Sequence, residues 1–159
     1  MANQKITPFL WFDKQAEEAA QFYTSIFKNS KILHVSRYGD GGPGPKGSVM
    51  VVNFQLAGQE FTALNGGPRF QFSEAFSFVV NCDNQQEIDE YWSKLTSGGG
   101  EESMCGWLKD KFGFSWQIVP TAFGKLMSDK YPKKVNRVME VLLKMRKLDI
   151  AKLQAAAEG

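Results

Sequence analysis

Residues 6–27 read ITPFLWFDKQAEEAAQFYTSIF, and residues 75–96 read AFSFVVNCDNQQEIDEYWSKLT. Each stretch begins with a short apolar run, passes through polar residues and continues with apolar side chains at helical spacing. At an offset of 69 residues, Leu10 aligns with Val79, and Phe22-Tyr23 aligns with Tyr91-Trp92. The sequence therefore predicts that a strand followed by a helix occurs twice, in matching register.

Strand patterns follow each of these helices. After the first helix they cover residues 31–38, 48–56 and 59–65, and Ala57-Gly58 is expected to form a tight hairpin. After the second helix, residues 101–109 are expected to form a strand or a strand pair, and residues 115–119 a strand that Pro120 closes. The segment 58–62 matches 113–117 at an offset of 55, which aligns Thr62 with Gln117. We therefore predict two βαβββ repeats, at residues 5–68 and 74–120.

Two segments fall outside this repeat pattern. Residues 121–159 are predicted to be a helical tail whose apolar stripe covers either the outside of a sheet or a partner subunit, and Asp149 is expected to cap its last helix. Residues 39–47 read GDGGPGPKG, a composition that excludes a regular helix or strand. This segment is predicted to be a mobile surface loop, with a lid over a site as the alternative.

Composition limits the class of protein. The 159 residues suit one domain, residues 1–159, and 43% of them are hydrophobic. Formal net charge is only +2, and the basic stretch 125–147 is interpreted as the solvated face of a helix, so no nucleic-acid partner is expected. No apolar run approaches the roughly 20 residues of a membrane span. Cys82 and Cys105 form no CxxC motif, and we expect a cytoplasmic protein with both thiols reduced.

Several motifs resemble those of a known family. They are ITPFLWF at residues 6–12, AEEAAQFY at 16–23, LNGGP at 64–68, CGWLKD at 105–110 and FGFSWQIVP at 112–120. The sequence resembles the vicinal-oxygen-chelate (glyoxalase, bleomycin-resistance and dioxygenase) superfamily and, within it, the PhnB-like subfamily labelled 3-demethylubiquinone-9 3-methyltransferase. The resemblance is judged to extend through the tail. It implies an α+β fold in which two βαβββ repeats form a curved mixed sheet around a central cup, followed by C-terminal helices, and it implies a homodimer.

In metal-dependent members of that superfamily, repeat-related strands supply His, Gln or Glu ligands. Carried over onto this chain, the resemblance places the four ligand slots at Pro8 (or Thr7), Thr62 (or Ala63), Ser77 and Gln117. None of these is the imidazole, carboxylate or thiolate that a divalent transition metal requires. The single histidine, His34, falls on a different predicted strand. We therefore expect no metal and no cofactor.

The methyltransferase label is implied by resemblance only, because no glycine-rich loop joins a predicted parallel strand to a helix. Whether the protein is an enzyme stays open at this point, and no catalytic residue is assigned. Neither cysteine has a neighbouring histidine that could activate it.

The remaining interpretation is a pocket for a small ligand. We predict that the protein binds a small apolar or aromatic compound, including quinone-like ones, without a metal. The alternatives are a metal-dependent lyase or dioxygenase of the same superfamily and a drug-sequestering binding protein. The candidate pocket residues lie on or beside the predicted cup-lining strands: Trp11, Thr62, Asn65, Ser77, Cys105, Trp107, Trp116 and Gln117. Strand neighbours alternate between faces, so only some of them are expected to point inward.

Overall fold

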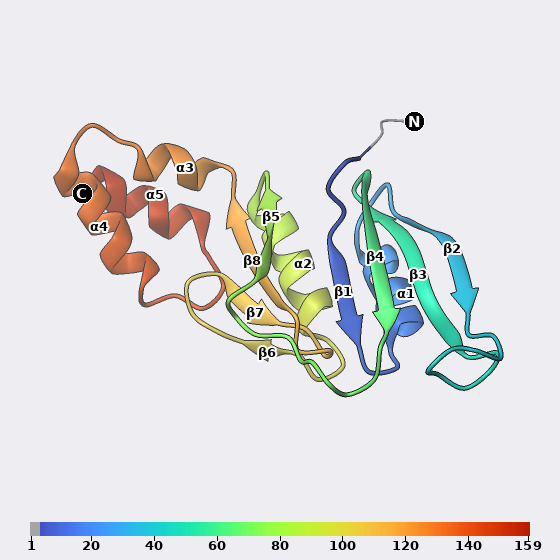
Figure 1. The fold of residues 1–159 in the computed structure, drawn as a ribbon. Coiled ribbons are helices and arrows are strands. Elements are labelled where there is room, and N and C mark those ends of the chain that lie inside the picture. Colours follow the sequence, from blue (N-terminus) through green and yellow to red (C-terminus); the bar gives the residue numbers. More distant parts are fainter. Residues whose placement is uncertain (1–3) are drawn as a thin grey trace. The chain divides into compact units, whose positions relative to one another are not determined.

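The computed structural model describes residues 4–159, which divide into one unit ending at Phe72 and another from Ser73 to Gly159 (Figure 1). In the first unit, β1 pairs parallel with β4, the other neighbours are antiparallel, and the sheet order is β1-β4-β3-β2. Its elements are β1 (Phe9–Phe12), α1 (Ala16–Ile26), β2 (Lys31–Arg37), β3 (Val49–Leu56) and β4 (Gln59–Asn65).

The second unit repeats this arrangement. Its sheet has the order β5-β8-β7-β6, with β5 and β8 parallel. The elements are β5 (Ser77–Cys82), α2 (Gln85–Thr96), β6 (Glu101–Glu102), β7 (Trp107–Lys109) and β8 (Ser115–Pro120). The tail adds α3 (Ala122–Met127), α4 (Pro132–Leu142) and α5 (Ile150–Glu158). The predicted α+β class, the two βαβββ repeats and the C-terminal helices are therefore confirmed. The strand pair within 101–109 is confirmed too, and α3 is a short helix that the sequence did not single out. That the units form one domain around a shared cup remains a prediction.

The two repeat helices bury equivalent faces. At the predicted offset of 69 residues, Tyr23 corresponds to Trp92 and Ile26 to Leu95, and all four side chains are buried. The N-terminus of α2 is capped by Asn84, whose Oδ1 accepts a hydrogen bond from the backbone N–H of Glu87 at 2.9 Å. The apolar stripe of each helix thus determines which face of the helix packs against its sheet.

The parallel strand pairs require a different offset. Phe9 stands opposite Thr62 in the first sheet, and Val79 stands opposite Gln117 in the second. With Thr62 aligned on Gln117, Val79 corresponds to Phe9 at an offset of 70. Exposure agrees, because Phe9 is 60% and Val79 is 49% exposed, whereas Leu10 is buried. The predicted alignment of Leu10 with Val79 is therefore wrong by one residue, and the strand-to-helix connection is one residue shorter in the second repeat.

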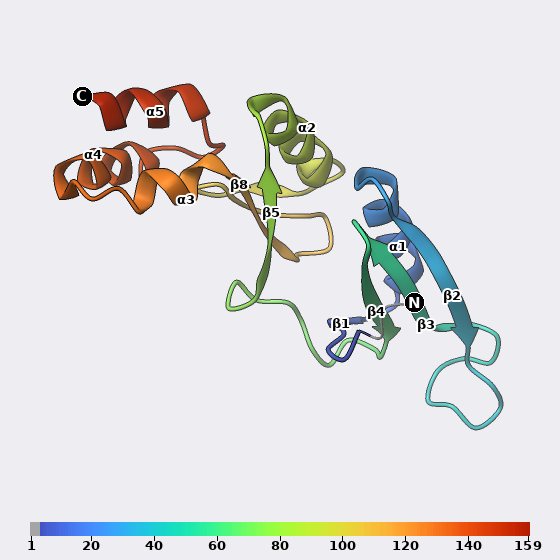
Figure 2. The same ribbon diagram turned by 90° about the horizontal axis from the view of Figure 1, so that it is seen from above.

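Each sheet has one face covered by its helix and one face left open within its own unit (Figure 2). In β8, Trp116, Ile118 and Pro120 are buried on the side of α2. Side chains alternate along a strand, so Gln117 and Val119 point to the opposite, open face, where both are only half-buried. The open faces are the places where a ligand could contact the sheets.

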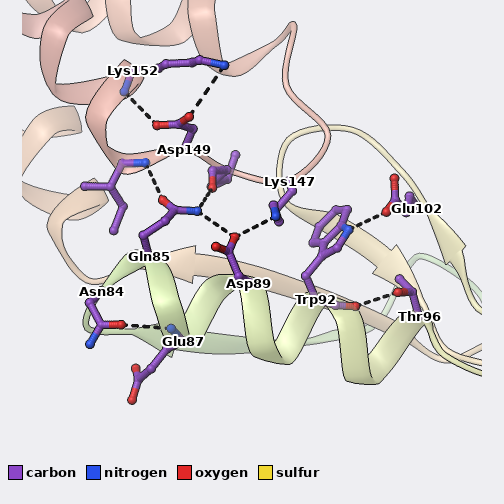
Figure 3. A network of polar contacts seen from close by, with 12 residues as sticks. Asn84, Gln85, Glu87, Asp89, Trp92, Thr96, Glu102, Lys147, Asp149 and Lys152 are labelled. Atoms are coloured by element: carbon purple, nitrogen blue, oxygen red, sulfur yellow. Dashed lines mark hydrogen bonds and ion pairs between the residues drawn. The ribbon is translucent and has the colours of Figure 1, made fainter.

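The tail docks on the second repeat through a polar network around α2 (Figure 3). The Gln85 side chain donates to the carbonyl oxygen of Leu148 at 3.0 Å and accepts from the backbone N–H of Ile150 at 2.9 Å. Lys147 forms an ion pair with Asp89 at 2.7 Å. Within the tail itself, a small apolar cluster holds the helices together: Val138, Leu142, Leu148 and Leu153.

We predict that Gln85→Ala destabilises the protein by about 1–3 kcal/mol, because it leaves two partly buried backbone groups of the tail without their side-chain partner. Urea unfolding followed by far-UV circular dichroism measures the change in the free energy of unfolding. Gln86→Ala is the matched control, since Gln86 is exposed on the same helix. Equal stabilities of the two variants would show that the network does not anchor the tail.

Candidate functional site

The open face of the second sheet carries a row of four polar residues. Glu101 on β6 stands opposite Lys109 on β7, Lys109 opposite Ser115 on β8, and Ser115 opposite Ser77 on β5. Directly opposed side chains in a sheet lie about 5 Å apart, so neighbouring members of this row lie side by side. The row crosses all four strands of the sheet.

A second row lies beside the first. Trp107 stands opposite Gln117, and Gln117 opposite Val79. The Gln117 Nε2 group donates a hydrogen bond to the Ser77 Oγ atom at 2.9 Å, which links the two rows. Val79 and Trp107 supply apolar surface on either side of this amide. The face therefore combines an indole ring, an aliphatic side chain and an amide–hydroxyl pair.

The first sheet has a related amide–hydroxyl pair. The Asn53 Nδ2 group donates to the Thr62 Oγ1 atom at 2.9 Å, on the face opposite the buried Phe61 and Ala63. The offset of 70 residues aligns Thr7 rather than Pro8 with Ser77, and on this alignment Thr7 is the predicted slot residue. Thr7 is exposed and lies just before β1. Three of the four slots thus carry a hydroxyl group and the fourth an amide.

These side chains do not fit a divalent transition metal. Neutral hydroxyls and amides lack the charge and donor strength of imidazole, thiolate or carboxylate ligands. Among the residues that the structure describes, no three His, Cys, Asp or Glu side chains gather into a group that could hold a metal ion. His34 lies on β2 and faces no such group within residues 4–159. We therefore derive no chemistry through a metal at these slots.

A pocket of about 460 Å³ opens beside the polar row of the second unit. Ser115 lines it and is only 1% exposed, yet its Oγ atom has no hydrogen-bond partner among the described residues. Lys109 forms an ion pair with Glu74. The hydrogen bond between them raises the pKa of the lysine and lowers that of the glutamate, and the attraction between their charges adds to both shifts. Cys105 and Trp107 also line this pocket.

The tail supports one wall of this pocket. Cys105 has a φ of 60°, in the left-handed region that costs a non-glycine residue about 1–2 kcal/mol. Its backbone N–H donates to the carbonyl oxygen of Met145 at 2.7 Å, and the N–H of Gly106 donates to that of Arg146 at 2.8 Å. A side chain at Gly106 would collide with the carbonyl oxygen of Ile118, at 2.9 Å from the added Cβ. The tail thus holds the segment that presents Cys105 and Trp107.

The first unit has a pocket of about 510 Å³ beneath the Gly/Pro-rich loop. The loop wraps around Tyr38, because a Cβ atom at Gly42 or Gly44 would collide with the tyrosine ring. The Tyr38 hydroxyl donates to the carbonyl oxygen of Asn65 at 2.6 Å, and Lys46 pairs with Asp40 at 2.7 Å. The Tyr38 contacts anchor the loop on the unit, whereas the Lys46–Asp40 pair lies within the loop itself. Its predicted mobility and its role as a lid remain predictions.

The structure places the aromatic and amide candidates in different environments. The Trp11 ring packs over Gly66, and its Nε1 group donates to the carbonyl oxygen of Gly67 at 2.9 Å. Asn65 faces the helix side, where its Oδ1 accepts from the N–H of Ala16 at 2.8 Å, so its amide positions the start of α1. Trp116 is buried on the side of α2, and its Nε1 group donates to an Asp110 carboxylate oxygen at 2.8 Å.

The structure therefore gathers four of the eight candidates on the open side of the second unit, namely Ser77, Cys105, Trp107 and Gln117. Thr62 lies on the open face of the first unit. Sequence reasoning missed Ser115, Lys109 and Glu101. A sequence signal existed for two of them, because Ser115 lies two residues from Gln117 on β8 and Lys109 lies two residues from Trp107 on β7. Glu101 had no such signal, since only its pairing with Lys109 places it in the row.

Comparisons with known proteins agree with this architecture. The family model described as 3-demethylubiquinone-9 3-methyltransferase matches residues 4–119. The chain is 42% identical to a PhnB protein from Bacillus cereus of known structure, with a TM-score of 0.68, covering 74% of this chain and 100% of that one. The family match ends before the helical tail, contrary to the expectation that the resemblance extends through it.

Two more distant structures support the fold alone. A Pseudomonas aeruginosa protein is 21% identical with a TM-score of 0.61, covering 74% of this chain and 98% of that one. The fosfomycin resistance protein FosX from Listeria monocytogenes is 15% identical with a TM-score of 0.58, covering 81% and 100%. A comparison with curated proteins gives no match. No helix within residues 4–159 is long and apolar enough to cross a membrane.

We predict that the two thiols differ sharply in reactivity. Cys82 is fully buried, and this burial, together with the neighbouring Glu87 and Asp83, raises the pKa of its thiol to about 12. It therefore stays protonated and shielded at pH 8, whereas Cys105 is only half-buried. A thiol reagent such as Ellman's should modify one cysteine in the native protein and two after denaturation. Cys105→Ser should remove the native reaction, and a reaction that survives this substitution would contradict the assignment.

Proposed function

The chain belongs to the 3-demethylubiquinone-9 3-methyltransferase (PhnB-like) family, and on that premise we propose that it binds a small apolar or aromatic ligand, including quinone-like compounds, without a metal ion. The binding surface is the open face of the second sheet. One observation carries the proposal: Gln117, at a slot where metal-dependent relatives of the fold would place a ligand, bonds to Ser77 instead.

The chemistry of this face suits such a ligand. Trp107 and Val79 offer apolar surface for a planar ring, and the Gln117 amide between them can orient a ligand carbonyl or hydroxyl. The adjacent pocket of about 460 Å³ falls within the size range of small-molecule sites. Pockets of this kind use a mostly apolar wall for affinity and a few fixed polar groups for orientation.

The methyltransferase name of the family gains no support from these residues. Transfer from S-adenosylmethionine commonly uses a glycine-rich loop between a strand and the following helix. The connection from β1 to α1 is Asp13-Lys14-Gln15, and the connection from β5 to α2 is Asp83-Asn84. Neither connection contains a glycine, so neither can bring its backbone close to such a cofactor in that manner. We therefore propose binding as the activity and assign no reaction.

To test the proposal, protein treated with a chelator is titrated with 1,4-naphthoquinone and followed by NMR of indole and side-chain amide groups. We expect saturable shifts of the Trp107 indole and Gln117 amide resonances. Gln117→Ala should weaken binding about 2- to 10-fold, the effect of one net hydrogen bond. Gln86→Ala is the matched control and should bind normally. Binding that appears only after addition of a divalent metal would overturn the metal-free proposal.

We also propose that the protein is a homodimer, an assembly that the family resemblance and the apolar tail first suggested. The tail leaves two large apolar side chains on its surface, since Tyr131 is 53% and Leu143 is 59% exposed. Light scattering coupled to size exclusion should give twice the mass of one 17.9 kDa chain. Leu143→Glu places a charge on the exposed apolar surface of the tail and should shift the measured mass toward that of the monomer. A monomer at micromolar concentration in the unsubstituted protein would contradict the proposal.

A further inference from the structure

The Ser115 hydroxyl is a buried polar group of the second unit that lacks a hydrogen-bond partner among the described residues. Buried polar atoms almost always find a hydrogen-bond partner, and leaving one without a partner costs folding free energy. Among the described residues, Ser115 Oγ is the buried side-chain oxygen or nitrogen that lacks one. The serine lines the pocket of about 460 Å³, so a ligand entering that pocket can supply the missing bond.

The charges around the same pocket select the kind of ligand. Three glutamates line it against a single lysine: Glu74, Glu101 and Glu102 against Lys109. Lys109 is already engaged by Glu74, and Glu102 accepts a hydrogen bond from the Trp92 Nε1 group at 2.7 Å. Glu101 stands opposite Lys109 on the open face. Glu102 also lies 3.9 Å from the Arg146 guanidinium, so Glu101 supplies the remaining negative charge, which favours a cation and disfavours an anion.

The strand pairing places the Ser115 hydroxyl and the Glu101 carboxylate in the same row. Lys109 lies between them. Two strand spacings separate their backbones by ~10 Å. Trp107, on β7 beside this row, also lines the pocket and can pack against an apolar body or a cationic group.

We propose that this pocket binds a small aromatic amine in its protonated form. Its ammonium group faces Glu101, its ring packs beside Trp107, and a hydroxyl or carbonyl at the other end bonds to Ser115 Oγ. The inference rests on the proposed function, because it names the class of ligand that the second open face accepts.

A matched set of three probes tests the charge preference. The probes are 4-hydroxyphenethylamine, 2-(4-hydroxyphenyl)ethanol and 4-hydroxyphenylacetate, which share the ring and phenol and differ in the charge at the other end. Isothermal titration should show the amine binding about fivefold more tightly than the alcohol, and the carboxylate most weakly, as expected for one exposed ion pair. Glu101→Gln should remove the difference between the amine and the alcohol.

Ser115→Ala tests the hydroxyl separately. Removing an unpartnered buried oxygen should raise the melting temperature of the free protein by about 2–4 °C, while amine binding weakens about tenfold. Ser103→Ala is the control, since Ser103 lines the same pocket but is exposed, and it should change neither quantity. A lower melting temperature with unchanged affinity would make Ser115 a structural residue and overturn its role.

The outcomes separate this inference from the proposed function. If 1,4-naphthoquinone binds in a Gln117-dependent manner but the three phenols bind equally or in reverse order, the charge selection is wrong and the metal-free binding function stands. If 1,4-naphthoquinone does not bind, and the amine alone binds and loses affinity when Ser115 or Glu101 is replaced, the pocket assignment holds and the quinone-like ligand class is wrong. Absence of binding by all four compounds at millimolar concentration would overturn both.

Discussion

The parallel pairing of the first and last strands in each repeat is the constraint on which the rest of the structure depends. In both sheets the first strand of the repeat, β1 or β5, lies at one edge and pairs with the last strand, β4 or β8. It does not pair with the next strand in sequence. After this strand, the chain must cross from one edge of the sheet to the opposite edge. The helix that makes this crossing covers a single face of the sheet. The other face receives no helix from its own repeat. A face that its own repeat leaves without a helix is therefore a consequence of topology before any particular residue is chosen.

The tail adds a second constraint to one repeat only. Backbone hydrogen bonds from Cys105 and Gly106 to the carbonyls of Met145 and Arg146 tie the β6–β7 connection to residues that lie outside the family match. The same connection contributes Cys105 and Trp107 to the pocket of the second unit. Within the described part of the first unit, residues 4–72, no tail segment plays this part, and the Gly/Pro-rich loop folds around Tyr38 instead. The two repeats thus share a topology while offering different surroundings to a ligand.

Much of the fold could be predicted from sequence, because periodicity is a local property. The apolar spacing of Tyr23 and Trp92 located both helices, and the alternation around Ala57-Gly58 located a hairpin. The alignment of Leu10 with Val79 failed for an equally physical reason. Helix register and strand register are set by separate contacts, and a connection that is one residue shorter changes the offset between them. A single offset could not describe both elements.

The candidate site was harder to predict, because the face on which a side chain lies depends on pairing between strands far apart in sequence. Asn65 and Trp116 carry groups suited to ligand binding, yet their partners are the N–H of Ala16 and the carboxylate of Asp110, which direct them to the covered faces. Ser115 is the opposite case: its spacing of two residues from Gln117 indicates a shared face, but nothing in the sequence shows that its hydroxyl lacks a partner.

The place of Ser115 in the site is seen only when β5, β7 and β8 are aligned. This alignment puts Ser115 between Ser77 and Lys109 in one row. An unpartnered hydroxyl at that point lowers stability, whereas neighbouring Gln117 and Ser77 satisfy each other. Lys109 likewise pairs with Glu74, so the Ser115 hydroxyl carries a cost that these neighbouring polar groups do not. A ligand that supplies the missing bond would recover that cost, and this ties the position of Ser115 to binding rather than to the stability of the sheet.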